Sequence, residues 1–91
     1  MEKKPGHVLV IPEEFEAVLT RLKKRPDLLE RFNKQVQKVL REPAFGKPLR
    51  NVLRNYRRVH IGSYVLVYEI KENEVRLLDF DHHDKVYKKY S

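Results

Sequence analysis

Hydrophobic residues in the first half of the chain follow one short strand-like run and then two helical stripes. Residues 7–11 are mostly apolar and end at a proline, which is typical of a strand. Residues 13–25 place their apolar side chains on one side, with acidic residues first and basic residues last, as in an amphipathic helix. A second apolar stripe covers residues 28–40. We expect Pro26 to end the first helix and Asp27 to cap the second, which predicts an antiparallel helical hairpin.

The period of the pattern changes from helical to alternating after a turn region at residues 44–49. Residues 56–61, 64–70 and 75–80 are rich in β-branched and aromatic residues and are separated by short polar turns. The predicted fold class is α+β in a single domain over residues 1–91. It has an N-terminal strand, an αα hairpin and a three-stranded antiparallel meander, which form one sheet packed on the helices. The tail beyond residue 80 shows no clear apolar face.

Gly62 and Ser63 fix the register of the first predicted β-hairpin. With these two residues as the turn, Ile61 faces Tyr64 and His60 faces Val65. Opposed residues share a sheet face, so one face carries the apolar side chains that pack on the helices: Val59, Ile61, Tyr64 and Leu66. The other carries Arg58, His60, Val65 and Val67. We expect this second face to be free of helices and to form the working surface.

The net charge and the composition restrict which partners and cofactors the chain can have. The chain has 91 residues and 20 Lys+Arg against 13 Asp+Glu, which gives a formal net charge of +7. It has no cysteine, which excludes a disulfide scaffold, a thiolate nucleophile and a cysteine-ligated metal. No apolar run approaches the roughly 20 residues that span a bilayer. We expect a cytoplasmic protein without a membrane partner.

The positive charge is concentrated between residues 47 and 60, where no acidic residue occurs. Tyr56 and His60 lie among its five basic residues: Lys47, Arg50, Arg54, Arg57 and Arg58. A basic segment with interleaved rings is suited to a phosphate backbone and its bases. In the tail, Lys88 and Lys89 lie beside Tyr87 and repeat this combination. A solvated loop, or a surface for an acidic protein segment, would show the same charge pattern.

Three histidines in the second half of the chain are candidates for proton transfer. Cleavage of RNA by its own 2′-hydroxyl needs a base, an acid and a cation for the phosphate, and imidazole can fill both proton roles. His60 and a histidine after the third strand of the meander could face one another across a phosphate. His82, His83 and Asp84 also resemble a metal-ligand cluster, but neighbours on an extended chain point to opposite sides. We therefore expect no metal and no cofactor.

Three sequence runs together carry a resemblance to a known family. They are GKPLR at residues 46–50, YRRVHIGSYVLVYEI at residues 56–70 and DHHDKVY at residues 81–87. In this order they resemble the RelE/ParE toxin superfamily of type II toxin–antitoxin systems. The resemblance implies a small basic toxin held inactive in a complex with a RelB-like antitoxin. For RelE-like members it implies cleavage of mRNA in the ribosomal A site, without a metal.

The resemblance also implies roles for individual residues. Arg58 and His60 match two catalytic strand positions, and His60 and His83 are similar to the histidines of the YafQ branch. Lys47 falls where that branch has another histidine, and Tyr87 matches a tyrosine that positions the scissile nucleotide. His60 is expected as the base, His83 as the acid and Arg58 as the phosphate clamp, with base and acid interchangeable. The further residues expected to bind RNA are Arg50, Arg54, Arg57, Lys88 and Lys89.

Two positions depart from the pattern of RelE-like relatives. Val65 stands where many of them carry an arginine that stabilises the phosphate, and Asp81 falls near another such position. Both departures predict a weak or vestigial nuclease. Two alternatives therefore stay open: a ParE-like inhibitor of DNA gyrase, and a catalytically degenerate homologue that acts as a binding partner.

Overall fold

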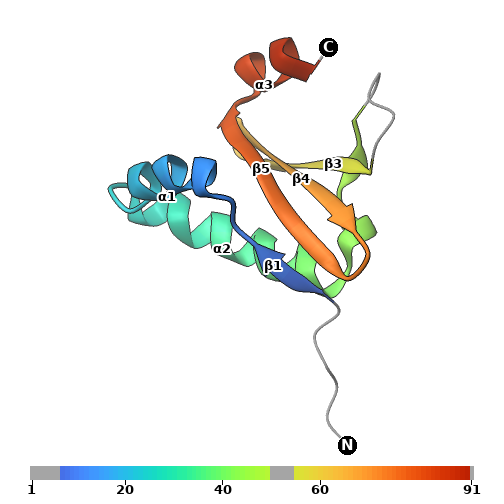
Figure 1. Cartoon of the computed structure of the whole chain (residues 1–91). Coiled ribbons are helices and arrows are strands. Elements are labelled where there is room, and N and C mark those ends of the chain that lie inside the picture. The colour runs from blue at the N-terminus through green and yellow to red at the C-terminus, as the bar shows by residue number, and fades with distance from the viewer. Residues whose placement is uncertain (1–6, 50–54, 91) are drawn as a thin grey trace, which may run out of the picture.

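The fold is a mixed sheet with helices on both faces, shown by a computed structural model that describes residues 7–49 and 55–90 (Figure 1). Five strands lie in the order β1-β5-β4-β3-β2. They are β1 (Val8–Val10), β2 (Lys47–Pro48), β3 (Tyr56–Ile61), β4 (Tyr64–Lys71) and β5 (Glu74–His82). β1 runs parallel to β5, and the other neighbouring pairs are antiparallel. The predicted α+β class and the meander β3-β4-β5 are confirmed.

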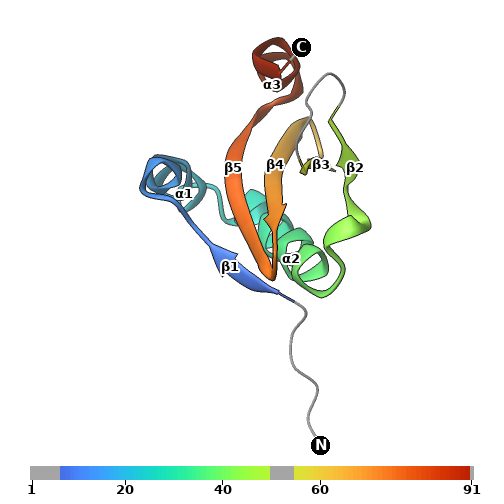
Figure 2. The same ribbon diagram turned by 45° about the vertical axis from the view of Figure 1, so that its right-hand side comes forward.

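Two helices, α1 (Glu16–Leu22) and α2 (Pro26–Arg41), form the hairpin on one side of the sheet (Figure 2). The predicted first helix begins with a 3₁₀ turn, η1 (Glu13–Phe15), and ends at Leu22. The prediction that Asp27 caps the second helix is wrong, because Pro26 is already its first helical residue. Proline suits this position, since its fixed φ is helical and its missing N–H has no partner in the first turn.

The predicted register of the β3–β4 hairpin is confirmed at every pair. Ile61 lies opposite Tyr64, and His60 lies opposite Val65. The turn requires a glycine, because Gly62 has a φ of 64°, a left-handed conformation that other residues rarely adopt. The alternation of faces along β3 therefore follows directly from the position of this turn.

A β-bulge interrupts the pairing between β4 and β5. Val67 lies opposite Asp79, but Tyr68 lies opposite Leu77, so Leu78 is an extra residue in β5. The extra residue reverses the alternation of faces, and Leu77 and Phe80 therefore both point into the main core.

The main core lies between the sheet and the α1–α2 hairpin and includes a chain of aromatic rings. Phe32 packs on Phe15 and Phe80 with ring centroids 6.2 and 5.2 Å apart, and Phe80 stacks on Tyr64 at 5.2 Å. Val59, Ile61 and Leu66 are buried in the same cluster, as the predicted register requires. Burial of these side chains holds β3 and β4 against α2.

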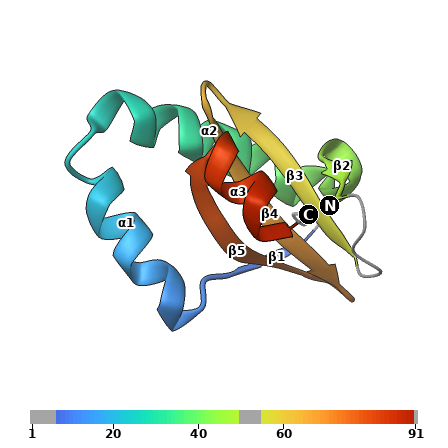
Figure 3. The same cartoon turned by 90° about the horizontal axis from the view of Figure 1, so that it is seen from above.

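The opposite face of the sheet is covered at one end by a third helix, α3 (His83–Tyr90) (Figure 3). Val86 of α3 is 1% exposed and packs on Val65 and Val67, which are fully buried. The predictions of a helix-free face and of a tail without an apolar side are therefore wrong. The apolar side of α3 consists of Val86 and Tyr90 alone, spaced one helical turn apart, which is too few positions to show a period. No helix in the described residues is long and apolar enough to cross a membrane.

The predicted turn region at residues 44–49 contains the edge strand β2, preceded by a second 3₁₀ turn, η2 (Pro43–Phe45). Lys47 pairs with Arg58 across β2 and β3. The hydroxyl of Tyr68 donates to the Pro43 carbonyl at 2.6 Å and accepts from the Gly46 N–H at 2.9 Å. Burial raises the pKa of Tyr68, partly opposed by the Gly46 hydrogen bond and by Arg57. Tyr68 thus fixes the segment that leads into β2.

Candidate functional site

Tyr87 of α3 brings together the predicted catalytic residues of β3 and α3. Its hydroxyl lies 3.1 Å from Nε2 of His60, and its ring centroid lies 6.1 Å from that of His83. The guanidinium carbon of Arg58 lies 5.9 Å from the centroid of the Tyr87 ring. His60 is exposed, while Arg58 and His83 are half-buried. We call the surface formed by Arg58, His60, His83 and Tyr87 the histidine face.

Strand alternation and the start of α3 explain this convergence. Arg58 and His60 are two residues apart on β3, so both point away from the α1–α2 hairpin. His83 and Tyr87 are four residues apart on α3, so they lie on one side of that helix. Packing of Val86 on the sheet sets α3 over β4, and Tyr87 then reaches His60. The histidine face therefore depends on the second apolar cluster beneath it.

Asp84 orients His83. Its carboxylate Oδ1 lies 2.9 Å from Nδ1 of His83. A proton on Nδ1 is donated to this carboxylate, which leaves Nε2 for proton exchange with a substrate. Carboxylate–imidazole pairs of this kind hold the ring and its tautomer in many active sites.

His82, His83 and Asp84 are closer together than an extended chain would allow. Their potential ligand atoms all lie within 4.8 Å of one another, and the two imidazole rings are 4.3 Å apart. The expectation that these side chains diverge is wrong, because the helix begins at His83 and turns the chain. Nitrogen and carboxylate ligands of this kind are compatible with a transition metal. The Asp84 contact already occupies Nδ1 of His83.

Lys47 lies at the edge of the same region. It is exposed on β2 and lines a groove of about 210 Å³ together with Arg58 and His60. Nη1 of Arg58 donates to the Pro48 carbonyl at 3.0 Å, which ties the guanidinium to β2. Two cationic side chains, Lys47 and Arg58, therefore line the groove beside His60.

The residues expected to bind RNA do not all share the histidine face. Arg57 points to the face covered by α2, where its Nη1 donates to the Gly46 carbonyl at 2.6 Å. Arg57 thus holds the segment that leads into β2 from the sheet face opposite to the histidine face. It does not contribute to the RNA-binding surface that we propose. Lys89 forms an ion pair with Asp79 at 2.7 Å, and Lys88 is exposed on α3. Arg50 and Arg54 lie outside the described residues.

The two departures from the RelE pattern have different surroundings. Val65 is fully buried between the sheet and α3, so this position contributes packing where an arginine would contribute charge. Asp81 accepts a hydrogen bond from the His82 N–H at 2.7 Å and lines a cavity on the other side of β5. Among the four residues of the histidine face, Arg58 is the one whose side chain is positively charged at every physiological pH.

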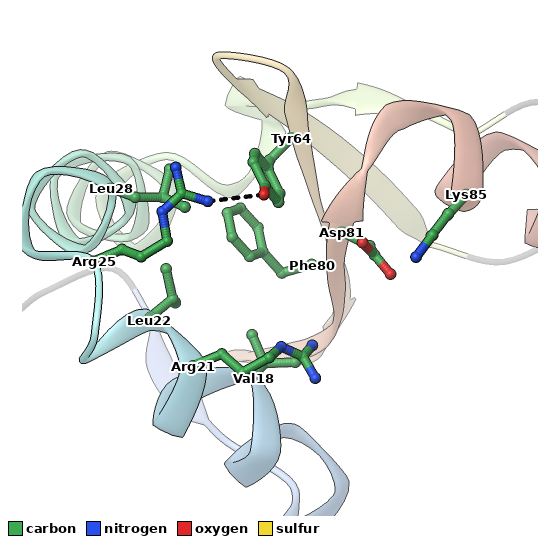
Figure 4. Close-up of a pocket in the computed structure, with 9 residues that line it drawn as sticks. All are labelled: Val18, Arg21, Leu22, Arg25, Leu28, Tyr64, Phe80, Asp81 and Lys85. Atoms are coloured by element: carbon green, nitrogen blue, oxygen red, sulfur yellow. Dashed lines mark hydrogen bonds between the residues drawn. The ribbon is translucent and has the colours of Figure 1, made fainter.

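The cavity that Asp81 lines has a volume of about 370 Å³ and lies between the helical hairpin and the end of the sheet (Figure 4). Leu22, Leu28 and Phe80 form its apolar floor. Arg21, Arg25 and Lys85 surround it with positive charge, against which Asp81 is the single carboxylate in the lining. Nη1 of Arg25 donates to the hydroxyl of Tyr64 at 3.0 Å, so these two lining side chains are joined (Figure 4). The cavity combines apolar depth with a cationic rim.

Two structural partners of the site were missed by sequence reasoning. Asp84 is expected from the sequence only as a metal ligand, whereas the structure shows its carboxylate next to the imidazole of His83. Tyr68, which holds the approach to β2, gave no signal, because its partners are more than 20 residues away in the chain.

Comparison with known proteins identifies the family. Residues 9–87 match the family model described as the ParE toxin of the type II toxin–antitoxin system parDE. A Methanocaldococcus jannaschii protein whose name gives it as toxin RelE4 is 39% identical over 87% of this chain and 88% of its own length. An uncharacterized protein of Methanosarcina mazei is 35% identical over 89% of this chain and 99% of its own length. The chain therefore belongs to the RelE/ParE superfamily of toxins from type II toxin–antitoxin systems.

Proposed function

We propose that this toxin is a metal-independent endoribonuclease that cuts mRNA in the ribosomal A site and so stops translation. The observation that carries the proposal is the contact of one tyrosine, Tyr87, with both His60 and His83. These contacts gather two imidazoles and a guanidinium at one exposed surface. A ParE-type inhibitor that acts only by binding has no need of such an arrangement.

In the proposed reaction, His60 takes the proton from a ribose 2′-hydroxyl, and the 2′-oxygen attacks the adjacent phosphorus. The bond from phosphorus to the 5′-oxygen breaks, and His83 gives its proton to that oxygen. The products are a 2′,3′-cyclic phosphate and a 5′-hydroxyl, and the two imidazoles have exchanged protonation states. Proton transfer by positioned groups of this kind contributes about 10² to 10⁴ in rate.

Arg58 and Lys47 supply the positive charge that the phosphate needs. Arg58 is held between the Tyr87 ring and the Pro48 carbonyl, so its guanidinium is already oriented toward the histidine face. With valine at position 65, this single clamp replaces a pair of cations, which supports slow turnover. Removal of one such donor typically costs about 10² to 10³ in rate.

The toxin's partner in the cell is a RelB-like antitoxin, with which it forms a heteromeric complex in the cytoplasm. The cavity between the helical hairpin and the sheet supports this part of the proposal, because its rim carries Arg21, Arg25 and Lys85 around an apolar floor. An acidic amphipathic segment would place apolar side chains in the cavity and carboxylates on its rim.

A second candidate function is inhibition of DNA gyrase. The observation that favours it is the family model itself, which describes the ParE toxin of parDE. A third candidate, a degenerate homologue that only binds, is favoured by the buried Val65. Neither gives a role to the contact of Tyr87 with His60.

Primer extension on mRNA in a reconstituted translation reaction tests the proposal. We expect cuts at the A-site codon that appear only when ribosomes and the chain are both present. A parallel supercoiling assay with purified gyrase is expected to show no inhibition. Gyrase inhibition without mRNA cuts would establish the second candidate, and neither effect, with no growth arrest on expression, would establish the third.

A further inference from the structure

The junction of β5 and α3 gathers three potential metal ligands at an accessible part of the surface. They are the imidazoles of His82 and His83 and the carboxylate of Asp84, whose ligand atoms all lie within 4.8 Å of one another. The chain turns here from the last residue of β5 into α3, so three consecutive side chains converge (Figure 1). None of the three is buried, and the Asp84 side chain is 72% exposed. An ion from the solvent can therefore reach all of them.

The Asp84 carboxylate lies between the two imidazoles. Its Oδ1 is 2.9 Å from Nδ1 of His83, and its Oδ2 is 3.8 Å from Nδ1 of His82. The backbone N–H of Asp84 donates to Nδ1 of His82 at 3.3 Å, so this nitrogen carries a lone pair and no proton. The two ring centroids are 4.3 Å apart. Nδ1 of each imidazole therefore faces the same carboxylate.

These separations fit a single tetrahedral ion. Zinc binds nitrogen and oxygen at about 2.0–2.2 Å, and tetrahedral angles then place neighbouring ligand atoms about 3.3–3.6 Å apart. The two nitrogen–oxygen distances, 2.9 and 3.8 Å, lie on either side of this range, so small rotations of exposed side chains suffice. Two imidazoles with one carboxylate suit Zn²⁺, whereas Mg²⁺ and Ca²⁺ prefer oxygen ligands alone. Water would fill the fourth position.

We propose that His82, His83 and Asp84 bind one Zn²⁺ ion, and that this ion switches the histidine face off. The ion replaces the proton that Nδ1 of His83 shares with Asp84, and this proton passes to the solvent. A zinc-bound imidazole holds its remaining proton on Nε2 more tightly than an imidazolium does, and it has no free nitrogen to take up another. His83 then cannot serve as the acid. The zinc site is independent of the proposed nuclease function, on which only the inhibition rests, and the reaction itself stays metal-independent.

Titration of the chain without a polyhistidine tag tests the site directly. Tetrahedral Co²⁺ absorbs visible light, and Zn²⁺ should displace it at one ion per chain, whereas Mg²⁺ should not. His82→Ala leaves the four residues of the histidine face in place and should weaken binding at least about tenfold, because loss of a mere hydrogen-bond partner of a ligand already costs about 10- to 100-fold. His60→Ala is the matched control and should bind as the wild type does. Equal affinities of wild type and His82→Ala, or no binding at micromolar Zn²⁺, overturn the proposal.

Cleavage of mRNA in the reconstituted reaction then tests the switch. We expect micromolar Zn²⁺ to slow the wild-type chain and a chelator to restore cutting. His82→Ala should cut at the wild-type rate without zinc and need at least about tenfold more zinc for the same inhibition. Equal inhibition of the two proteins would place the effect elsewhere and overturn the switch. If the ion binds in a His82-dependent way but no mRNA is cut under any condition, the nuclease proposal fails and the metal site stands.

Discussion

The hydroxyl of Tyr87 lies 3.1 Å from Nε2 of His60, which links the C-terminal helix to the central hairpin across the histidine face. A neutral His60 that accepts the tyrosine proton at Nε2 carries its own proton on Nδ1, and this is the tautomer able to act as a base. Tyr87 therefore holds the imidazole in a receptive orientation before RNA arrives.

Replacement of either histidine of the histidine face should abolish cleavage and leave the fold intact. His60→Ala and His83→Ala each remove a proton-transfer group, and we expect losses of about 10² to 10⁴ in the single-turnover rate of mRNA cutting. Primer extension measures the rate, and circular dichroism checks the fold. His7→Ala is the control, since His7 lies next to β1 and away from the face. Wild-type rates in both His60→Ala and His83→Ala would refute the assignment.

Tyr87→Phe separates the hydroxyl of Tyr87 from its ring. The phenyl ring keeps its contacts with Arg58 and His83, while the hydrogen bond to His60 is lost. A net hydrogen bond of about 1 kcal/mol predicts a loss of roughly fivefold in cleavage rate. Tyr87→Ala should lose considerably more, because the ring is removed as well. Equal rates for Tyr87→Phe and Tyr87→Ala would mean that the ring has no part in positioning.

Arg57 and Arg58 are adjacent in sequence and should behave oppositely on substitution. Arg58→Ala removes the proposed phosphate clamp, so we expect a drop of about 10² or more in cleavage rate. Arg57→Ala removes the hydrogen bond to the Gly46 carbonyl on the other face, so we expect a lower free energy of unfolding, by about 1–3 kcal/mol. Urea unfolding and primer extension on both variants make the comparison. The reverse result would show that the two faces are wrongly assigned.

Gly46→Ala should destabilise the segment that leads into β2. A Cβ atom at this position would lie 2.5 Å from the Tyr68 hydroxyl and 2.7 Å from the Arg58 carbonyl oxygen, and the backbone oxygen cannot easily move. Overpacking of this kind costs about 1–3 kcal/mol, measured as a lower urea midpoint. An unchanged midpoint for Gly46→Ala would contradict the close approach of Tyr68.

The free energy of unfolding should fall at high pH, because the tyrosines that pack against the sheet ionise there. Burial and the Asp79 and Tyr56 groups raise the pKa of Tyr90 from 10.0 to about 12. A raised pKa means that the unfolded chain loses its phenolic proton first, so the contribution is complete below pH 10 and is lost as pH rises toward 12. Tyr68 shifts in the same direction. Urea midpoints across this range should fall less steeply in Tyr90→Phe than in the wild type, and an equal fall would contradict the shift.

The parts of the fold that follow local rules could be predicted from the sequence. The alternation around Gly62 and Ser63 gave the register of β3 and β4, because one residue of slip would have buried Arg58 and His60. Helix α3 could not be found in this way, since Val86 and Tyr90 alone face the sheet. The bulge at Leu78 carries no composition signal that separates it from a regular strand residue.

The candidate site was predictable only as a set of residue types. Sequence placed Arg58 and His60 on one face, but a run of basic residues did not reveal that Arg57 points to the other. The partners of Tyr87 lie 27 residues away on β3 and one helical turn away on α3, and only the packing of α3 on the sheet brings them together.

The position of α3 has a practical consequence for anyone who labels this toxin. The helix that carries His83 and Tyr87 is the last described element of the chain, whereas β1 lies toward the far end of the molecule (Figure 1). A purification tag or fluorophore joined after α3 would sit beside the histidine face and could obstruct it. The resulting fall in activity could be mistaken for a toxin that is intrinsically inactive. The same group joined ahead of β1 leaves that surface accessible, so amino-terminal fusions are the suitable reagents for ribosome and antitoxin assays.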